Sequence, residues 1–127
     1  ANSLNWNGSV SIMSLQAYHH AQAATENPRV TEYRLFGQVT GALLTAKESN
    51  AIGTQLIEAI DWNRQLWRTL AADCMDDRNT LTQDVRAKII SLSLWVSKYS
   101  RSVAREKASL DPLIEINRTI MQGLQAS

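Results

Sequence analysis

The chain has 127 residues, of which 44% are hydrophobic and 20% are charged, and its formal net charge is +1. This length supports one domain with a single core, and the composition is that of an ordinary soluble globular protein, which argues against disorder throughout. A charge so close to zero gives no electrostatic reason to expect nucleic acid or an anionic membrane as a partner.

The single cysteine, Cys74, excludes a disulfide within the chain and fits a reducing compartment. No apolar run approaches the roughly 18–20 residues that a membrane-spanning helix requires. The first residues lack the basic and apolar segments of a secretory signal peptide. We therefore expect a cytoplasmic protein with no membrane-spanning segment.

Residues 1–12 are polar, rich in Asn, Ser and Gly, and without sustained periodicity, and a methionine follows at position 13. This pattern favours a leader or linker ahead of a native start at Met13. The alternative is a genuine flexible arm that docks through its few apolar side chains. We expect a single domain over residues 13–127.

A first helix is expected over about residues 14–26, which are strong helix formers. It ends at Asn27 and Pro28, because proline disfavours the helical conformation at the residue before it and suits the first turn of a new helix. The only histidines, His19 and His20, diverge by about 100° on this helix and cannot face one metal ion together. We therefore expect no metal site.

A second helix is expected over residues 28–48, where Tyr33 and Phe36 belong to an apolar face. Gly37 and Gly41 lie one turn apart on the same helix. One interpretation is that both are tolerated glycines, each costing about 1 kcal/mol relative to alanine. The other is that they form a smooth groove against which another helix or a partner packs closely.

A third helix is expected over residues 54–75, with the segment 61–74 at the centre of the fold. Its apolar positions recur at alternating spacings of four and three, which is typical of a helix packed along one seam. Cys74 lies on this seam without a histidine or basic group nearby in sequence, so we expect it to fill core volume rather than to act as a nucleophile. The seam comprises Leu56, Ile60, Trp67, Leu70 and Cys74, with Asn63 filling the gap in the pattern.

A fourth helix, the longest, is expected over residues 82–107, and the same spacing runs along it. At 1.5 Å per residue it would span on the order of 39 Å, the full length of a small bundle. A second apolar side accompanies the seam, and so broad a face predicts contact with two neighbouring helices. The predicted seam is Val85, Ile89, Leu92, Val96, Tyr99 and Val103, and the second side is Ile90, Leu94 and Trp95.

After a break that ends at Pro112, a fifth helix is expected over residues 112–124, with an apolar side and Asn117 beside it. No segment has the alternation typical of a strand. The sequence therefore predicts an all-α fold, an antiparallel bundle of four to five helices joined by short loops.

Asn63 and Asn117 lie on or beside these apolar seams. Burying an amide without hydrogen-bond partners costs roughly 1–3 kcal/mol, so both side chains need partners. We expect the two asparagines to be structural polar pins, which pair with each other or cap a loop and so fix the helix register. The alternative is that they bond to the backbone of a partner protein.

The sequence contains no arrangement of residues that is typical of catalysis. A glycine-rich phosphate-binding loop, a serine nucleophile motif, a Glu-x-x-His pair of a di-iron bundle and paired carboxylates in an evident cleft are all missing from it. We therefore expect no catalytic residue, no metal and no cofactor, and a protein that is not an enzyme.

Four runs of the sequence resemble the flagellar biosynthesis regulator FlaF family of alphaproteobacteria. They are MSLQAYHHAQAATENPRVTEYRLFGQVTGAL at 13–43, DWNRQLWRTLAADC at 61–74, IISLSLWVSKY at 89–99 and LDPLIEINRTIMQGL at 110–124. The resemblance covers nearly all of residues 13–124 in the expected order and also supports Met13 as the native start. Residues 1–12 lie outside it.

The resemblance implies a small cytoplasmic protein needed for flagellin production and export. Members of the family are understood to act with flagellin, as a secretion chaperone or assembly factor, in a circuit with the translational regulator FlbT. Flagellin has amphipathic terminal helices that must be kept from polymerising early, and a helical groove lined by aromatic and aliphatic side chains can cover such a helix. We expect flagellin as the partner, and FlbT as a second candidate.

Two surfaces are candidates for binding this partner. Tryptophan is a frequent anchor at interfaces, and we expect that Trp62, Trp67 and Trp95 do not all lie in one small core. The first candidate surface is Trp62, Arg64, Trp67 and Trp95. The second is Tyr33, Phe36, Gly37 and Gly41.

Two other functions stay open at this point. One is a regulator of flagellin expression that acts on RNA, which would require a basic stripe, yet Arg64, Arg68, Arg101 and Arg105 are only modestly grouped. The other is an architectural bundle that binds a regulator such as FlbT and never touches flagellin.

Overall fold

The structure, a computed structural model, describes residues 28–126, and within that range it consists of four helices and no strand. The predicted all-α bundle is confirmed, and the predicted helix boundaries agree with the observed ones to within two residues. The expectations for residues 1–12, for a helix over residues 14–26 and for its two histidines lie outside the described residues. The helices are α2 (Pro28–Glu48), α3 (Gly53–Met75), α4 (Gln83–Glu106) and α5 (Asp111–Ala126).

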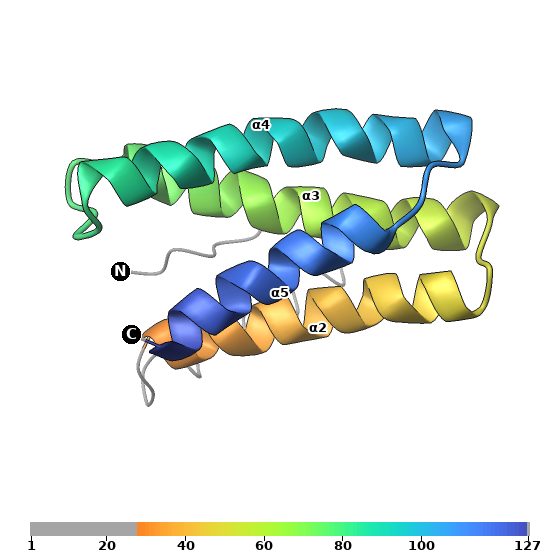
Figure 1. Cartoon of the computed structure of the whole chain (residues 1–127), viewed down its shortest axis with the longest axis horizontal. Helices are drawn as coiled ribbons and strands as arrows, with labels where there is room; N and C mark the ends of the chain where they lie inside the picture. The colour runs from red at the N-terminus through yellow and green to blue at the C-terminus, as the bar shows by residue number, and fades with distance from the viewer. Residues whose placement is uncertain (1–27, 127) are drawn as a thin grey trace.

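The four helices run alternately in opposite directions (Figure 1). α3 lies between α2 and α4 and packs against both, whereas α5 crosses the bundle diagonally and packs mainly against α2. Among the described helices, none besides α3 packs extensively on α4, although the sequence predicted two neighbours for α4.

Short turns and a few polar contacts fix the ends of the helices. Thr82 caps α4, since its Oγ1 accepts the backbone N–H of Val85 at 3.4 Å. Lys107 ends the same helix in the left-handed conformation, with φ of 57°. An ion pair of 2.7 Å between Lys47 Nζ and Asp111 Oδ1 joins the end of α2 to the start of α5. The ion pair bridges the corner at which α5 turns back across the bundle.

The core is built around two aromatic rings. Phe36 of α2 and Trp67 of α3 meet edge to face, with ring centroids 5.8 Å apart and an interplanar angle of 87°. The seam predicted for α3 faces this core, because Ile60, Leu70 and Cys74 are buried along with Trp67. Aliphatic side chains of all four helices complete the packing, among them Val39, Leu43, Leu66, Val96, Val103 and Leu113.

The buried side of α4 is rotated relative to the predicted seam. Two serines, Ser93 and Ser100, occupy buried positions, whereas Leu92 and Tyr99 are only partly buried. The small serine side chains let α4 approach α3 closely, and Ser93 Oγ donates a 3.2 Å hydrogen bond to the carbonyl oxygen of Trp67. The larger side chains beside the serines, Leu92 and Tyr99, pack against the margin of the core. The buried series of α4 is Ile89, Ser93, Val96, Ser100 and Val103.

Candidate functional site

A hydrogen-bonded network of polar side chains crosses the core between α2, α3 and α5. At its centre, Asn117 Oδ1 accepts the indole N–H of Trp67 at 2.8 Å. Asn117 Nδ2 donates to Asn63 Oδ1 at 2.8 Å and to Thr40 Oγ1 at 3.2 Å. The Thr40 hydroxyl in turn donates to the sulfur of Met121 at 4.0 Å. Asn63 and Asn117 therefore contact each other, which is one of the arrangements that the sequence predicted for them.

This network lies out of reach of any partner protein. Asn63 and Asn117 are both fully buried, so in this fold they cannot bond to a partner's backbone. Asn117 reaches groups on two other helices at once, and sliding α5 along them would leave several buried polar groups unpaired, each at a cost of about 1–3 kcal/mol. Of the side-chain nitrogen and oxygen atoms in this network, only Asn63 Nδ2 has no hydrogen-bond partner among the described residues. The role of the pair in fixing helix register stays a prediction.

The prediction that Trp67 and Phe36 bind a partner is wrong. Both side chains have 0% of their surface exposed. The physical reason is that three helices meet around them and large rings are needed to fill the space. The polar end of Trp67 is also already occupied, because its indole N–H is bonded to Asn117.

The second predicted surface is not assembled in this fold. A Cβ added at Gly37 would lie 3.6 Å from Cε of Met121, so Gly37 faces α5 of the same chain rather than a partner. A Cβ added at Gly41 would meet no described atom within 4 Å, so no close approach requires glycine there. Tyr33 is partly exposed, but Phe36 beside it is buried. These residues therefore do not share one accessible groove.

Trp62 and Arg64 do not form one surface either, because residues two positions apart on a helix point to different sides. Trp62 is partly buried against the core, and among the described residues its Nε1 has no hydrogen-bond partner. Arg64 pairs with Asp61 of its own helix, with 3.6 Å between Nη1 and Oδ1. Each keeps some accessible surface, but the two are not joined in one site.

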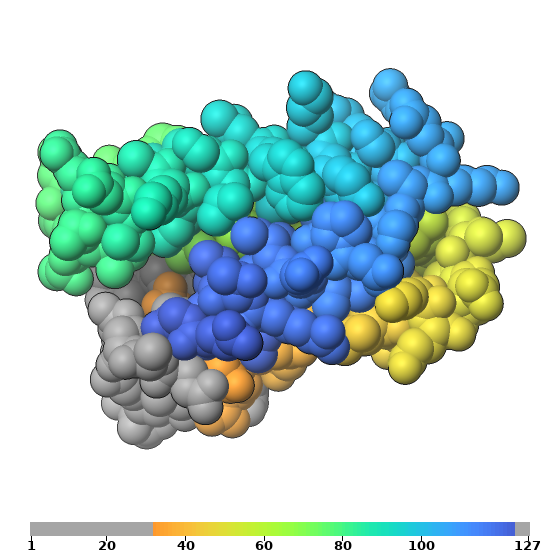
Figure 2. All heavy atoms as spheres, viewed as in Figure 1, coloured from red at the N-terminus to blue at the C-terminus, as the bar shows by residue number. Residues whose placement is uncertain are grey.

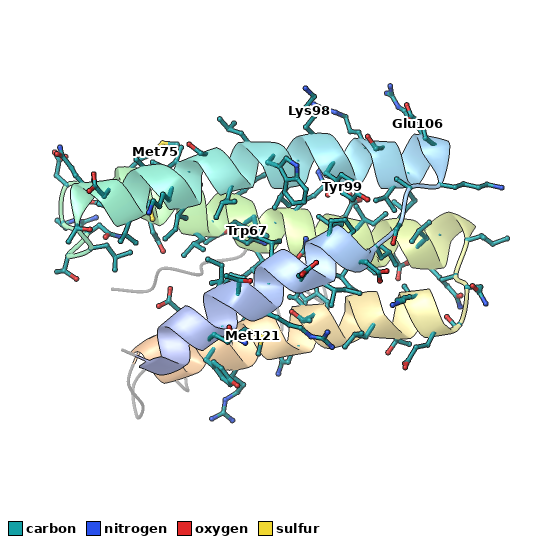
Figure 3. The ribbon with its side chains drawn as sticks, in the orientation of Figure 1. Trp67, Met75, Lys98, Tyr99, Glu106 and Met121 are labelled. Carbon is teal, nitrogen blue, oxygen red and sulfur yellow. The ribbon has the colours of Figure 1, made fainter. Side chains whose placement is uncertain are left out.

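A stacked aromatic pair, of which one ring is exposed, lies on α4. The rings of Trp95 and Tyr99 stack, with centroids 5.1 Å apart and an interplanar angle of 18°. Tyr99 lies on the side of α4 that faces α5 (Figure 3), and its hydroxyl donates a 2.7 Å hydrogen bond to the carbonyl of Ser109. Trp95 is 39% exposed and Leu94 is 70% exposed. Of the tryptophans predicted to bind a partner, Trp95 is the one that this fold presents in an exposed apolar group.

The C-terminal end of α3 holds a carboxyl group in an unusual environment. Burial raises the pKa of Asp73 to about 7, and the negative charges of Glu32 and Asp76 add to this effect. Burial likewise raises the pKa of the neighbouring Cys74 thiol, which disfavours the thiolate and makes nucleophilic chemistry there unfavourable. Residues 28–126 contain no group of three His, Cys, Asp or Glu side chains placed to hold a metal ion.

Sequence reasoning missed the polar residues that complete the core. Thr40 was not predicted to be a hydrogen-bonding residue, and the burial of Ser93 and Ser100 was not predicted at all. The signal for the serines is their spacing, because they continue an alternating four-three pattern between apolar residues. Small polar residues at such positions mark where two helices approach closely.

The fold and its side chains define an all-α bundle whose polar network is closed off in the core and whose exposed apolar group lies on one outer helix. Among the described helices, none combines the length and the apolar character needed to cross a membrane. Residues 14–124 match the family model described as "Flagellar protein FlaF", and the chain therefore belongs to the FlaF family of flagellar proteins. Comparison with curated proteins and comparison with solved structures each gave no match.

Proposed function

We propose that this flagellar protein is a cytoplasmic assembly factor, without enzymatic activity, that binds flagellin as a secretion chaperone and supports its synthesis and export. Membership of the FlaF family supports the flagellar part of this proposal. The observation that carries the binding part is the exposed apolar group on α4, formed by Leu94 and Trp95, with the partly buried Tyr99 stacked on Trp95. An apolar group exposed on an otherwise well packed bundle is typical of a protein interaction site.

The physical argument concerns the protection of amphipathic helices. A flagellin terminal helix must bury its apolar side when the filament forms, and until then that side needs temporary cover. A helix with exposed aromatic and aliphatic side chains can supply such cover by packing alongside it. A stacked tryptophan and tyrosine give a large contact area at a small cost in side-chain entropy, because their rings are already held in place.

Calorimetry with the full-length chain and flagellin purified from the same source tests the proposal. We expect binding that Trp95→Ala or Leu94→Ser weakens about tenfold, because each removes apolar contact area from the interface. Ile52→Ser is the matched control, since Ile52 is 77% exposed but precedes α3 rather than belonging to α4. If the wild-type chain does not bind flagellin, the chaperone proposal fails.

The alternative is regulation of flagellin expression through RNA or through FlbT, without flagellin contact. The observation in its favour is that the exposed Lys98, Arg101 and Arg105 lie close together on α4. Parallel capture experiments with flagellin, with FlbT and with flagellin leader RNA separate these functions. Capture of FlbT from cells that lack flagellin, together with no capture of purified flagellin, would favour the alternative.

A further inference from the structure

The charges of α4 are distributed unevenly, although the whole chain is nearly neutral. Residues 85–105 contain five basic residues and no acidic one. One of the five, Arg86, points into the turn after α3, where its guanidinium donates to the carbonyl oxygens of Cys74 and Asp76. The four that are exposed to solvent are Lys88, Lys98, Arg101 and Arg105.

Three of these basic residues share a side of the helix with the exposed apolar group. Residues spaced by three, four or seven positions lie on the same side of a helix, so Lys98, Arg101 and Arg105 follow one line over about 10 Å. The same spacing places Leu94 and Trp95 beside Lys98. We define the α4 outer face by these five residues, Leu94, Trp95, Lys98, Arg101 and Arg105.

The α4 outer face is available for binding. α4 forms one edge of the molecule in the view of Figure 2, and Lys98 points away from the bundle in Figure 3. The ion pairs found among the described residues involve Lys47, Arg64 and Arg78, so the cations of this face have no carboxylate partner there. The acidic residues nearest in sequence, Asp84 and Glu106, lie beyond the two ends of the basic stretch.

The apolar part of this face is held in a fixed geometry before any partner arrives. Tyr99 is anchored by its hydrogen bond to the Ser109 carbonyl, and the Trp95 ring stacks on it at an angle of 18°. Burial and the nearby Asp111 carboxylate raise the pKa of Tyr99, so its hydroxyl keeps the proton that it donates. A rigid aromatic anchor loses little side-chain entropy on binding.

We propose that the α4 outer face docks an acidic amphipathic helix of a partner protein, with leucine-like side chains against Leu94 and Trp95 and carboxylates against Lys98, Arg101 and Arg105. Charge complementarity argues for this partner. The α4 outer face places unpaired cations beside apolar side chains, and an acidic amphipathic helix places carboxylates beside apolar side chains, so the two surfaces match. The inference holds whichever protein supplies the segment and does not depend on flagellin binding.

The same features argue against other occupants. A second copy of the chain, docked face to face through α4, would bring like charges together, which is unfavourable. RNA would use the basic residues, but the exposed Leu94 offers nothing to a phosphate, and one face of the Trp95 ring is already covered by Tyr99. The acidic helix is the partner that uses both the charged and the apolar parts.

Fluorescence anisotropy with the full-length chain tests this proposal. Two labelled synthetic helical peptides share one leucine stripe and differ only in carrying glutamate or lysine beside it. We expect the glutamate peptide to bind, with an affinity that falls as salt is added, and the lysine peptide to bind at least about tenfold more weakly. Equal binding of the two peptides would overturn the proposal.

Variants locate the binding on the surface. Because Lys98 and Arg101 are exposed, Lys98→Glu with Arg101→Glu should preserve the fold, as circular dichroism checks, and weaken glutamate-peptide binding about tenfold. Trp95→Ala should have a similar effect, whereas Arg118→Glu, an exposed charge reversal on α5, should change the affinity less than about twofold. The proposal is overturned if Arg118→Glu matters as much as the α4 variants. It is also overturned if homopolymer RNA binds the wild-type chain more tightly than the glutamate peptide does, or if sedimentation shows a dimer that Trp95→Ala dissociates.

Discussion

Two tryptophans of this chain, each on a strongly apolar helix, have opposite surroundings. Trp67 of α3 is fully buried, packed on Phe36 and bonded to Asn117, whereas Trp95 of α4 stacks on Tyr99 and stays 39% exposed. The difference arises from the number of neighbouring helices. Among the described helices, α3 packs against both α2 and α4, whereas α4 packs extensively against α3 alone. The same residue type thus serves packing at one position and is free for recognition at the other.

The largest effect is expected from truncating the two tryptophans in turn. Trp67→Ala should lower the free energy of unfolding by about 3–5 kcal/mol, because it opens a cavity and leaves Asn117 without a donor. Trp95→Ala is the matched control and should cost less than about 1 kcal/mol, since its ring is partly in solvent. Urea denaturation followed by far-ultraviolet circular dichroism measures both. Similar losses for the two variants would show that the buried and the exposed tryptophan do not differ in their contribution to stability.

A smaller effect is expected from removing the centre of the polar network. Asn117→Ala should destabilise the fold by about 2–3 kcal/mol, because the Trp67 indole and the Asn63 amide both lose their partner in a buried site. The pairing can be isolated with the double variant that also carries Asn63→Ala, whose effect should be smaller than the sum of the single ones. Strictly additive losses would show that the two side chains do not act as a pair.

A smaller, pH-dependent effect on stability is expected from the Asp73 carboxyl at the edge of the core. Its pKa is about 7 in the folded chain and near 3.8 when exposed, so the folded state binds more protons between these values. The protonated Asp73 carboxyl therefore contributes fully to the stability of the folded state below about pH 4. This contribution is lost as the pH rises through 7. Asp73→Asn should raise the free energy of unfolding at pH 8 by on the order of 1 kcal/mol, because solvent screens the partly buried carboxylate and limits the gain. The gain should be smaller at pH 5. Denaturation at the two pH values decides this, and an equal gain at both would refute the assignment.

The smallest effects come from the two buried serines of α4, Ser93 and Ser100. Ser93→Ala should cost about 1 kcal/mol, because the hydrogen bond to the Trp67 carbonyl is lost. Ser100→Ala should be neutral or stabilising by about 0.5 kcal/mol, since its buried hydroxyl has no partner within residues 28–126. Thermal unfolding of the two variants side by side makes the comparison. If Ser100→Ala is the more damaging change, the close contact of the two helices needs another explanation.

Much of the fold follows from the sequence because its helix signals are local. Helix starts are marked by the backbone preferences of a few residues, namely Asn27 and Pro28, Thr82, and the Asp111–Pro112 pair. The described helices begin within two residues of the predicted starts. The contact between Asn63 and Asn117 was also foreseeable, because a buried amide requires a partner and each is the polar interruption of an apolar seam.

The candidate site was harder to predict, because periodicity shows that a helix has apolar sides but not which side is covered. On α4 the seam through Leu92 and Tyr99 has the larger side chains, yet the buried positions are those of Ser93 and Ser100. Whether Trp67 or Trp95 is buried likewise depends on where α5 crosses, and no local pattern encodes that crossing. Net charge was equally uninformative, since it averages the basic face of α4 with acidic residues elsewhere.

The single cysteine gives this fold a built-in reporter of local opening. Cys74 is buried where α3 ends, and Arg86 of α4 donates from Nε to its carbonyl oxygen at 2.6 Å and from Nη2 to the Asp76 carbonyl at 3.2 Å. A thiol reagent can reach the sulfur only when the protein opens locally or unfolds. The labelling rate in the native state therefore reports that opening, and comparing it with global unfolding shows whether the end of α3 is uncovered while the rest of the bundle stays folded.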